Sequence, residues 1–558
     1  MYMDDYKRWL GFDLEDPALT AELRKIEGDE EQIKDRFAVA LKFGTAGLRG
    51  VLGAGSNRMN IYVVRQATQG LANWVKTQGG NQLVAVSYDS RINSDVFARE
   101  TAKVLAANGI KVRIYDALMP VPALSFATRF YGANAGVMIT ASHNPAKYNG
   151  YKAYGPDGCQ MTDDAAAVVY AEIQNTDILT GAKLISWEEG IAQGLIEYVG
   201  DDCKEGLYDA IKACQVRPGL CKTAGLKLVY SPLNGSGLVP VMRILNDIGI
   251  DDITIVPEQK DPDGNFPTCP YPNPEIKEAM ALGMEYAAKC NADLLLATDP
   301  DCDRVGIAVK NTAGEYVLLS GNETGVLLLD YICSRRIANG TMPEDPVMVK
   351  TIVTTDLAGQ VAAHYGVKTV NVLTGFKFIG EQIAMLEAKG KASSYIFGFE
   401  ESYGYLSGSY VRDKDAVDGA FLICEMFAYY ATQGIGLLDR LNSLYQQFGF
   451  CLNTLHSYEF EGSAGFAKMQ NIMKAFRGEL SGFGGKKITK VLDYAQGLDG
   501  LPASDVLKFV MEDNCSVVVR PSGTEPKLKT YISVSAKDKE TAMALEKKIT
   551  ADLAAFFS

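Results

Sequence analysis

The chain has 558 residues, 47% hydrophobic and 22% charged, as in ordinary soluble globular proteins, and its length predicts about three to five domains. The formal net charge of −13 and the lack of a long basic stripe argue against a nucleic acid or an anionic membrane as partner. A phosphorylated small molecule stays possible, because phosphate sites need only a few local cations.

The predicted elements alternate between strands and helices. Residues 83–87 predict a buried strand, a helical pattern starts near Ser94 and stops before Gly109, and residues 112–115 predict the next strand. This order is typical of an α/β fold with a mostly parallel sheet.

Further apolar strands run directly into polar loops. They are predicted at 135–139, 226–230, 294–297 and 394–397. Because open α/β sheets bind ligands at the carboxyl ends of their strands, we expect the chemistry in these loops. No residue-level repeat relates the segments, so any duplication would be structural only.

The last hundred residues follow another pattern. Strands are predicted at 514–520 and 529–534, a helix at about 538–557, and a surface loop at the glycine-rich stretch 482–485. The sequence thus predicts α/β domains at residues 1–205, 206–323 and 324–445, and a smaller α+β domain at 446–558.

The loop at 140–145, TASHNP, follows the predicted strand 135–139. A serine beside a histidine can be a nucleophile, and Ser142 precedes His143 in a chain with 3 histidines. By itself, however, this loop fits a helix N-cap serine beside a surface histidine better.

The loop at 299–304, DPDCDR, carries three alternating carboxylates. In an extended segment Asp299, Asp301 and Asp303 project to one side, where they repel one another unless a cation lies among them. Since the loop abuts an apolar strand, we interpret it as a Mg²⁺ site in preference to a solvated acidic turn. Arg304 could neutralise phosphate there or form a simple salt bridge.

Two more loops carry groups suited to sugars and phosphates. Residues 398–404, GFEESYG, offer carboxylates and a hydroxyl to sugar hydroxyls, although paired glutamates are usually just solvated. Residues 520–527, RPSGTEPK, could form a phosphate cradle or an ordinary turn. Without a Walker A loop or a Rossmann glycine fingerprint, the chemistry is not predicted to depend on a nucleotide.

The 11 cysteines show no CxxC spacing and predict reduced, buried thiols in a cytoplasmic protein. The first ten residues are too polar for a signal peptide. No apolar run reaches the length of a membrane span.

Taken in order, the four loops resemble the α-D-phosphohexomutases, in the branch of the phosphoglucomutases and phosphopentomutases. Three more segments resemble family motifs: 43–50, FGTAGLRG, the arginine segment; 88–91, YDSR; and 374–377, TGFK, the loop that supplies a lysine. The resemblance runs from about residue 40 to about residue 535. Seven ordered matches of this kind identify the chain as a member.

The resemblance implies three similar α/β domains with mostly parallel sheets and a smaller α+β C-terminal domain, arranged around a central cleft. It implies an isomerase that interconverts glucose 1-phosphate and glucose 6-phosphate. The reaction would pass through a phosphoserine enzyme, with glucose 1,6-bisphosphate as primer and intermediate. The expected partner is a hexose phosphate, with no nucleic acid and no membrane; the sequence is silent on oligomeric state.

The resemblance also implies a magnesium site. Ser142 would carry the phosphoryl group and, with Asp299, Asp301 and Asp303, hold Mg²⁺. The substrate would bind to a wider set of residues: Thr45, Arg304, Glu400, Ser402, Arg520, Ser522, Gly523 and Thr524.

Acid–base catalysis is expected from Lys377, His143 or Arg49, and the sequence does not decide among them. We expect Lys377 to lie close to His143, and Arg49 to stabilise charge. A phosphate-pairing role without proton transfer fits Lys377 equally well.

Several alternatives remain open. The Glu-Glu-Ser form of the sugar loop resembles glucose-directed members, whereas mannose-tolerant relatives tend to have methionine at the second position. Phe399 and its context also resemble mutases that accept pentose phosphates, so a phosphopentomutase is the nearest alternative, followed by a phosphomannomutase and a bisphosphate synthase. Outside the mutases, a non-catalytic sugar-phosphate binding protein would need neither Ser142 nor the three aspartates, and a metal-dependent phosphatase would gain nothing from the phosphate cradle.

Overall fold

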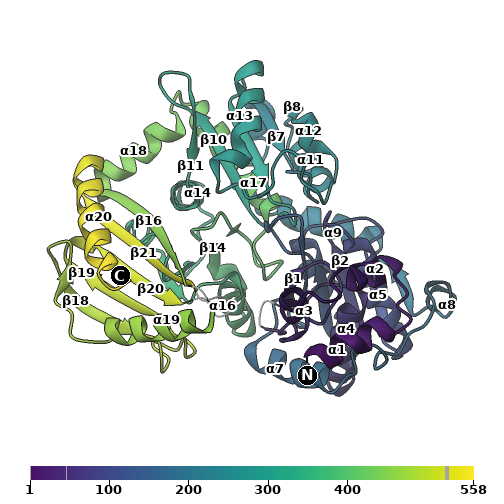
Figure 1. Ribbon diagram of the computed structural model, residues 1–558. Helices are drawn as coiled ribbons and strands as arrows, with labels where there is room; N and C mark the ends of the chain where they lie inside the picture. Colours follow the sequence, from purple (N-terminus) through teal and green to yellow (C-terminus); the bar gives the residue numbers. More distant parts are fainter. Residues whose placement is uncertain (1, 45–46, 461, 522–526, 558) are drawn as a thin grey trace. The chain divides into compact units, whose positions relative to one another are not determined.

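The computed structural model describes residues 2–44, 47–460, 462–521 and 527–557 (Figure 1). They form two compact units. The first contains residues 1–319, 380–392 and 404–428, and the second contains residues 320–379, 393–403 and 429–558. No described helix is both long enough and apolar enough to span a membrane.

The helices and strands up to Leu319 are α1 (Tyr2–Gly11), α2 (Pro17–Lys25), α3 (Glu30–Phe37), β1 (Leu48–Val51), α4 (Ile61–Thr77), β2 (Leu83–Tyr88), α5 (Ser94–Ala107), β3 (Lys111–Ile114), α6 (Val121–Phe130), β4 (Ala135–Ile139), β5 (Tyr148–Tyr154), α7 (Asp163–Gln174), α8 (Trp187–Ala192), β6 (Ile196–Tyr198), α9 (Asp201–Lys212), α10 (Leu220–Ala224), β7 (Lys227–Ser231), α11 (Leu238–Asp247), β8 (Asp252–Ile255), α12 (Pro257–Lys260), α13 (Lys277–Cys290), β9 (Leu294–Thr298), β10 (Val305–Lys310) and β11 (Tyr316–Leu319). Those that follow are α14 (Gly321–Ala338), β12 (Val347–Thr351), α15 (Leu357–His364), β13 (Lys368–Val372), α16 (Phe376–Ala388), β14 (Tyr395–Phe399), β15 (Tyr405–Leu406), α17 (Ala416–Ala431), α18 (Leu437–Phe448), β16 (Phe450–Glu459), α19 (Gly462–Phe476), β17 (Gly482–Phe483), β18 (Lys486–Asp493), β19 (Leu507–Met511), β20 (Ser516–Pro521), β21 (Lys527–Ala536) and α20 (Lys539–Ala554).

Three successive segments repeat one parallel arrangement of strands. The orders are β4-β2-β3, β9-β7-β8 and β14-β12-β13, and every pairing within them is parallel. In each segment the third strand along the chain ends in a polar loop, so the TASHNP, DPDCDR and GFEESYG loops occupy the same topological position. The predicted α/β class is therefore confirmed, and the duplication is visible only in the structure.

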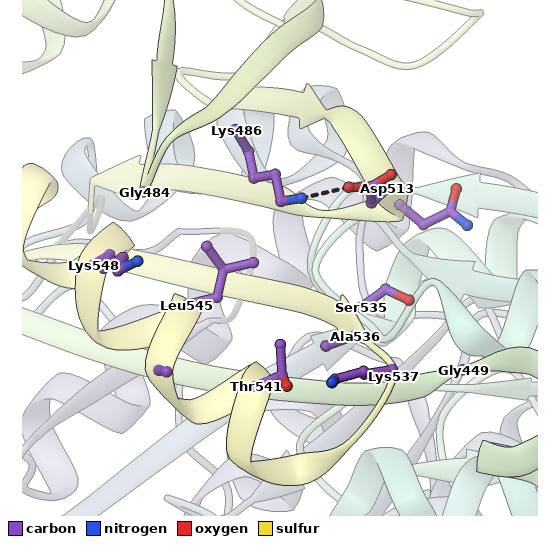
Figure 2. A pocket seen from close by; sticks show the side chains of 12 residues that line it. Gly449, Gly484, Lys486, Asp513, Ser535, Ala536, Lys537, Thr541, Leu545 and Lys548 are labelled. Carbon is purple, nitrogen blue, oxygen red and sulfur yellow. Dashed lines mark hydrogen bonds and ion pairs between the residues drawn. The ribbon is translucent and has the colours of Figure 1, made fainter.

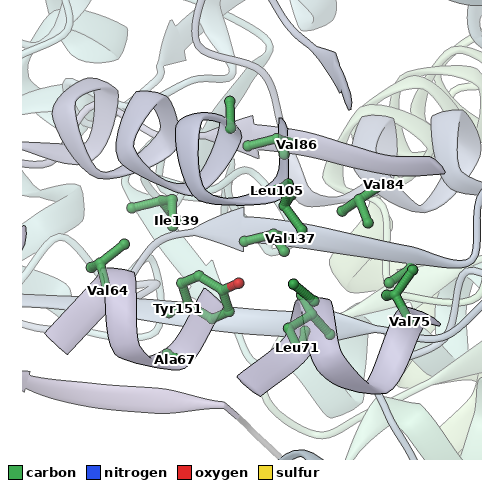
Figure 3. Packing of buried hydrophobic residues seen from close by; sticks show 14 of the residues in the cluster. Val64, Ala67, Leu71, Val75, Val84, Val86, Leu105, Val137, Ile139 and Tyr151 are labelled. Carbon is green, nitrogen blue, oxygen red and sulfur yellow. The ribbon is translucent and has the colours of Figure 1, made fainter. Parts of the chain in front are cut away.

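The first sheet is covered by helices whose apolar faces follow the helical period. Figure 3 shows Val64, Ala67, Leu71 and Val75 of α4 packed toward strand residues such as Val137, all of them buried. Asn60 starts this helix by accepting the backbone N–H groups of residues 62 and 63 with its side chain.

Tight packing at α4 gives a stability prediction. A Cβ added to Gly70 would lie 2.5 Å from Ile173 Cγ1 and 2.8 Å from the Ile173 backbone nitrogen. Gly70→Ala should therefore overpack this contact and destabilise the domain by about 1–3 kcal/mol, lowering Tm in calorimetry. The matched change Gly206→Ala in α9, where the new Cβ would lie 3.4 Å from the Phe126 ring, should stabilise by about 0.5–1 kcal/mol. A higher Tm for Gly70→Ala would refute the packing argument.

The last sheet has the antiparallel order β16-β21-β20-β19-β18-β17. Alternate residues face opposite sides: Val517 and Val519 pack with residues of α19 and α20, the helices drawn beside this sheet in Figure 1, whereas Val518 packs on the other side with Ile352 and Val353. This agrees with the predicted α+β C-terminal domain. The exact domain boundaries stay a prediction.

Two local predictions in this domain are wrong in part. The strand expected from residue 514 begins at Ser516, because Asn514 has a left-handed φ of 55° that ends strand geometry. Gly482 and Phe483, expected in a surface loop, pair as the short strand β17 with β18. All eleven cysteines are free and all but Cys290 are buried, as predicted.

Candidate active site

Ser142 lies at the end of β4 in a strained turn. Its φ is +52°, a left-handed conformation that costs about 1–3 kcal/mol for a residue other than glycine. The turn leads to strand β5 and not to a helix, so the N-cap interpretation of Ser142 is wrong. Its Oγ donates to Asp299 Oδ2 at 3.1 Å and lies 3.2 Å from His143 Nδ1.

The backbone of this turn is held by a buried arginine. The Arg91 guanidinium donates to the carbonyl oxygens of Ser142 and Asn144, and Arg91 is itself paired with Asp89 at 3.4 Å. Thr140 Oγ1 donates to Asp89 and accepts from the Ser142 N–H. Such interlocking contacts can keep a strained serine in place. They also give the YDSR segment a role, because its Asp89 and Arg91 hold the serine loop.

Asp299, Asp301 and Asp303 converge, although not as expected. The segment is a tight turn between the antiparallel strands β9 and β10, with Cys302 at a φ of +50°, so the expected extended segment is wrong. The turn nevertheless brings one oxygen of each carboxylate within 4.8 Å of the others. All three side chains are fully buried.

The donor set fits a small hard cation. Asp301 Oδ1 and Asp303 Oδ1 are buried and accept no hydrogen bond, which leaves oxygen ligands available of the kind that Mg²⁺ prefers. Burial and the neighbouring carboxylates raise the pKa of Asp299 well above its usual range, and the pKa of Asp303 also rises. Burial also acts on Asp301, but the Lys152 ammonium outweighs it and lowers the pKa of that carboxyl.

Two buried lysines form ion pairs with Asp301 and Asp303. Sequence reasoning missed both. Lys152 Nζ is 2.9 Å from Asp301 Oδ2 and 3.7 Å from Asp303 Oδ2, and Lys414 Nζ is 2.9 Å from Asp303 Oδ2. Lys152 belongs to strand β5 immediately after the serine loop, so its place in an otherwise uncharged strand was an available signal. Lys414 belongs to the run RDKD at 412–415. Four successive charges predict a solvated loop, but all four side chains are buried.

The other predicted residues of the first unit lie around Ser142. Arg49, on β1, is exposed and donates to Asn144 Oδ1 at 3.2 Å. Burial, with the charges of Arg304 and Arg49, lowers the pKa of His143 well below its usual value, so its imidazole is neutral at neutral pH. Arg304 forms an ion pair with Glu275, the simpler of its two predicted roles.

The second unit carries the remaining predicted residues. Glu400 is buried at the end of β14, Ser402 is half-buried in the same loop, and Arg520 lies near the end of β20. Lys377 is in the first turn of α16, with its ammonium 4.7 Å from the Phe378 ring centre. Its expected closeness to His143 stays a prediction. Four predicted substrate-binding residues lie outside the described part of the chain: Thr45, Ser522, Gly523 and Thr524.

One pocket elsewhere in the second unit contains none of the predicted site residues that the structure describes. This pocket, of about 740 Å³ in the C-terminal domain, is lined by Lys486, Lys537 and Lys548, among others, and Figure 2 shows Lys486 paired with Asp513 at its edge. Among the described residues of the four chemistry-bearing loops, none lines this pocket.

Models of the phosphoglucomutase/phosphomannomutase family match all four segments of the chain. Alpha/beta/alpha domain I matches residues 40–179, domain II 206–314, domain III 320–448 and the C-terminal domain 469–551. The chain is 35% identical over 537 residues to a phosphoglucomutase of Staphylococcus epidermidis, covering 94% of this chain and 96% of that one. It is 36% identical over 525 residues to a phosphoglucomutase of Staphylococcus aureus, with 92% of each chain covered.

Solved structures share the fold. Parafusin, a phosphoglucomutase from Paramecium, superposes with a TM-score of 0.70 at 19% identity, over 93% of this chain and 96% of that chain. A phosphoglucomutase/phosphomannomutase family protein from Burkholderia thailandensis gives 0.68 at 20% identity, over 92% and 97%. By the matches to all four domains and the identity to these relatives, the chain belongs to the phosphoglucomutase family of the α-D-phosphohexomutases and is an isomerase of that class.

Proposed function

We propose that this enzyme interconverts glucose 1-phosphate and glucose 6-phosphate through phosphorylated Ser142, with glucose 1,6-bisphosphate as primer and intermediate. The observation that carries the proposal is the 3.1 Å contact of Ser142 Oγ with Asp299 Oδ2, which joins the serine loop to the aspartate turn. A nucleophilic oxygen held beside clustered carboxylates and lysines suits a phosphoryl carrier.

Ser142 would alternate between giving and taking phosphate. In the first transfer the bond between phosphorus and Oγ breaks and a bond from phosphorus to the free sugar hydroxyl oxygen forms, while the hydroxyl proton passes to a base and Oγ takes up a proton. In the second, Oγ gives up that proton and bonds to the phosphorus of the other phosphate, while the bond from that phosphorus to the sugar oxygen breaks and the sugar oxygen takes up a proton. Asp299 Oδ2 and His143 Nδ1, at 3.1 and 3.2 Å, are the acceptors within reach.

Asp299, Asp301 and Asp303 would hold Mg²⁺, together with an oxygen of phosphorylated Ser142. A bound Mg²⁺ supplies charge neutralisation at the transferring phosphoryl group. Lys152 would donate to phosphoryl oxygens beside the aspartates, and Arg49 would add positive charge at the same loop.

The remaining residues would bind the substrate. Glu400 and Ser402 offer an acceptor and a hydroxyl to the ring, in a manner that tolerates either orientation of the sugar. A further set of residues is proposed to contact the phosphate groups of the substrate or to lie beside them: Thr45, Arg304, Lys377, Arg520, Ser522, Gly523 and Thr524.

The test is a coupled assay with glucose 1-phosphate, mannose 1-phosphate and ribose 1-phosphate, each primed with a trace of the matching bisphosphate. Glucose 1-phosphate is expected to give the highest kcat/KM. A higher value for ribose 1-phosphate would make the enzyme a phosphopentomutase, and release of inorganic phosphate in place of isomer would make it a phosphatase.

A further inference from the structure

A short turn at the end of strand β12, residues 351–354, holds the second glutamate of the sugar loop. Thr351 Oγ1 and Thr354 Oγ1 lie 3.3 and 3.4 Å from Glu401 Oε2 and 2.8 Å from each other. Since each hydroxyl has one proton, one hydroxyl donates to the other, and the second donates to the Glu401 carboxylate. Glu401 is therefore fastened to the turn through one carboxylate oxygen, whereas its neighbour Glu400 is buried at the end of β14.

A buried lysine of the same domain donates a hydrogen bond to the turn. Lys350 is 1% exposed, and its Nζ donates to the carbonyl oxygen of Thr354 at 3.0 Å and to Asp356 Oδ1 at 3.1 Å. A buried ammonium must keep such partners, because the cost of an unpaired buried charge is several kcal/mol.

A second lysine reaches the same place from the C-terminal domain. Lys508 lies on β19 between Leu507 and Phe509, which pack toward the helices, so its side chain projects from the opposite face of the sheet. Its Nζ donates to the Ile352 carbonyl oxygen at 3.1 Å and to Asp356 Oδ2 at 3.1 Å. Burial raises the pKa of Asp356, but the two lysines outweigh it and hold that pKa below its usual range.

Apolar packing completes the junction. Ile352 and Val353, the two central residues of the turn, pack in one cluster with Val518 and Tyr531 of the C-terminal sheet. Tyr531 and Val518 belong to the strands that flank the RPSGTEPK loop. One turn thus contacts the sugar loop on one side and the C-terminal domain on the other.

We propose that Glu401 is a positioning residue that couples the sugar loop to the docking of the C-terminal domain, through the 351–354 turn, Asp356 and Lys508. When Lys508 and Ile352 hold the C-terminal domain on the turn, the two threonine hydroxyls fix Glu401 and thereby the loop that presents Glu400 and Ser402 to the sugar. This inference rests on the proposed function for its substrate.

A double-mutant cycle tests the coupling. Glu401→Gln keeps an acceptor oxygen but loses the charge, and Lys508→Met removes the ammonium while keeping the apolar stem. Each change is expected to raise KM for glucose 1-phosphate by about 5- to 10-fold, with a smaller change in kcat. In the double variant, the increase in KM should be at least about 5-fold smaller than the product of the two single increases. Since the turn links the two side chains, simple additivity in an active, folded double variant would overturn the coupling.

A matched control separates coupling from general weakening of the C-terminal domain. Lys486→Met removes another lysine of that domain, one paired with Asp513 and not with Asp356 (Figure 2), and it should leave KM unchanged and combine additively with Glu401→Gln. Non-additivity of equal size in this control would also overturn the proposal.

Hydrogen exchange gives a readout that does not depend on activity. Lys508→Met should speed amide exchange in the sugar loop, residues 400–404, as well as in β19, while Lys486→Met should not affect the sugar loop. Faster exchange confined to the C-terminal domain in Lys508→Met would mean that Lys508 is only structural. An unmodified enzyme that turns over no hexose phosphate would refute the proposed function, while the exchange result would still decide the coupling.

Discussion

Replacement of Ser142 by alanine is expected to lower mutase turnover by at least about 10⁴-fold, because Ser142 is the residue proposed to carry the phosphoryl group between the two half-reactions. Glucose 1-phosphate should still bind within about 3-fold of the unmodified enzyme, since the proposed sugar and phosphate contacts lie on other loops. Removal of Oγ loses its hydrogen bond to Asp299, but the contacts of Arg91 and Thr140 with the Ser142 backbone remain, so the fold should survive.

Two measurements check this result. A coupled assay gives kcat, and incubation with radiolabelled glucose 1,6-bisphosphate followed by denaturation should label the unmodified enzyme but not Ser142→Ala. Ser186→Ala is the control: this serine caps helix α8 in the same domain, and its loss should cost about 1 kcal/mol of stability without affecting labelling. Normal turnover in Ser142→Ala would eliminate the phosphoserine mechanism.

The sequence predicted the loops well because each is a local feature. A polar segment after an apolar strand is visible in one stretch of chain, and the three loops that follow β4, β9 and β14 lie at the ends expected of parallel strands. The wrong details were also local. Ser142 and Cys302 adopt left-handed φ values that only surrounding contacts can maintain, and no propensity of serine or cysteine foretells them.

Lys414, one of the two lysines beside the aspartates, could not be found by the same reasoning. Lys414 is separated from Asp303 by more than a hundred residues, yet the two lie 2.9 Å apart. A run of four charges such as RDKD is usually solvated, and its burial follows from tertiary packing alone. Glu401 is a similar case, because the paired glutamates look equivalent in sequence while the structure fastens Glu401 to the threonine turn.

The substitution Asp301→Asn should produce the second large effect, loss of metal binding. Asp301 and Asp303 face the ammonium groups of Lys152 and Lys414, so an added divalent cation depends on every negative charge that remains. Asparagine removes one charge and keeps the size of the side chain, while Lys152 retains Asp303 at 3.7 Å, and the fold should survive.

Calorimetric titration with Mg²⁺ or Mn²⁺ is expected to show affinity lowered by at least about 100-fold in Asp301→Asn, with mutase activity lost in parallel. The control is Asp201→Asn, at an aspartate of α9 whose side chain is 96% exposed, which should bind metal normally. Exhaustive treatment of the unmodified enzyme with a chelator should abolish turnover, and readdition of Mg²⁺ should restore it. Unchanged rates in chelator would show that the buried aspartates serve the fold and not a metal, in which case Lys152 and Lys414 would be their permanent counter-ions.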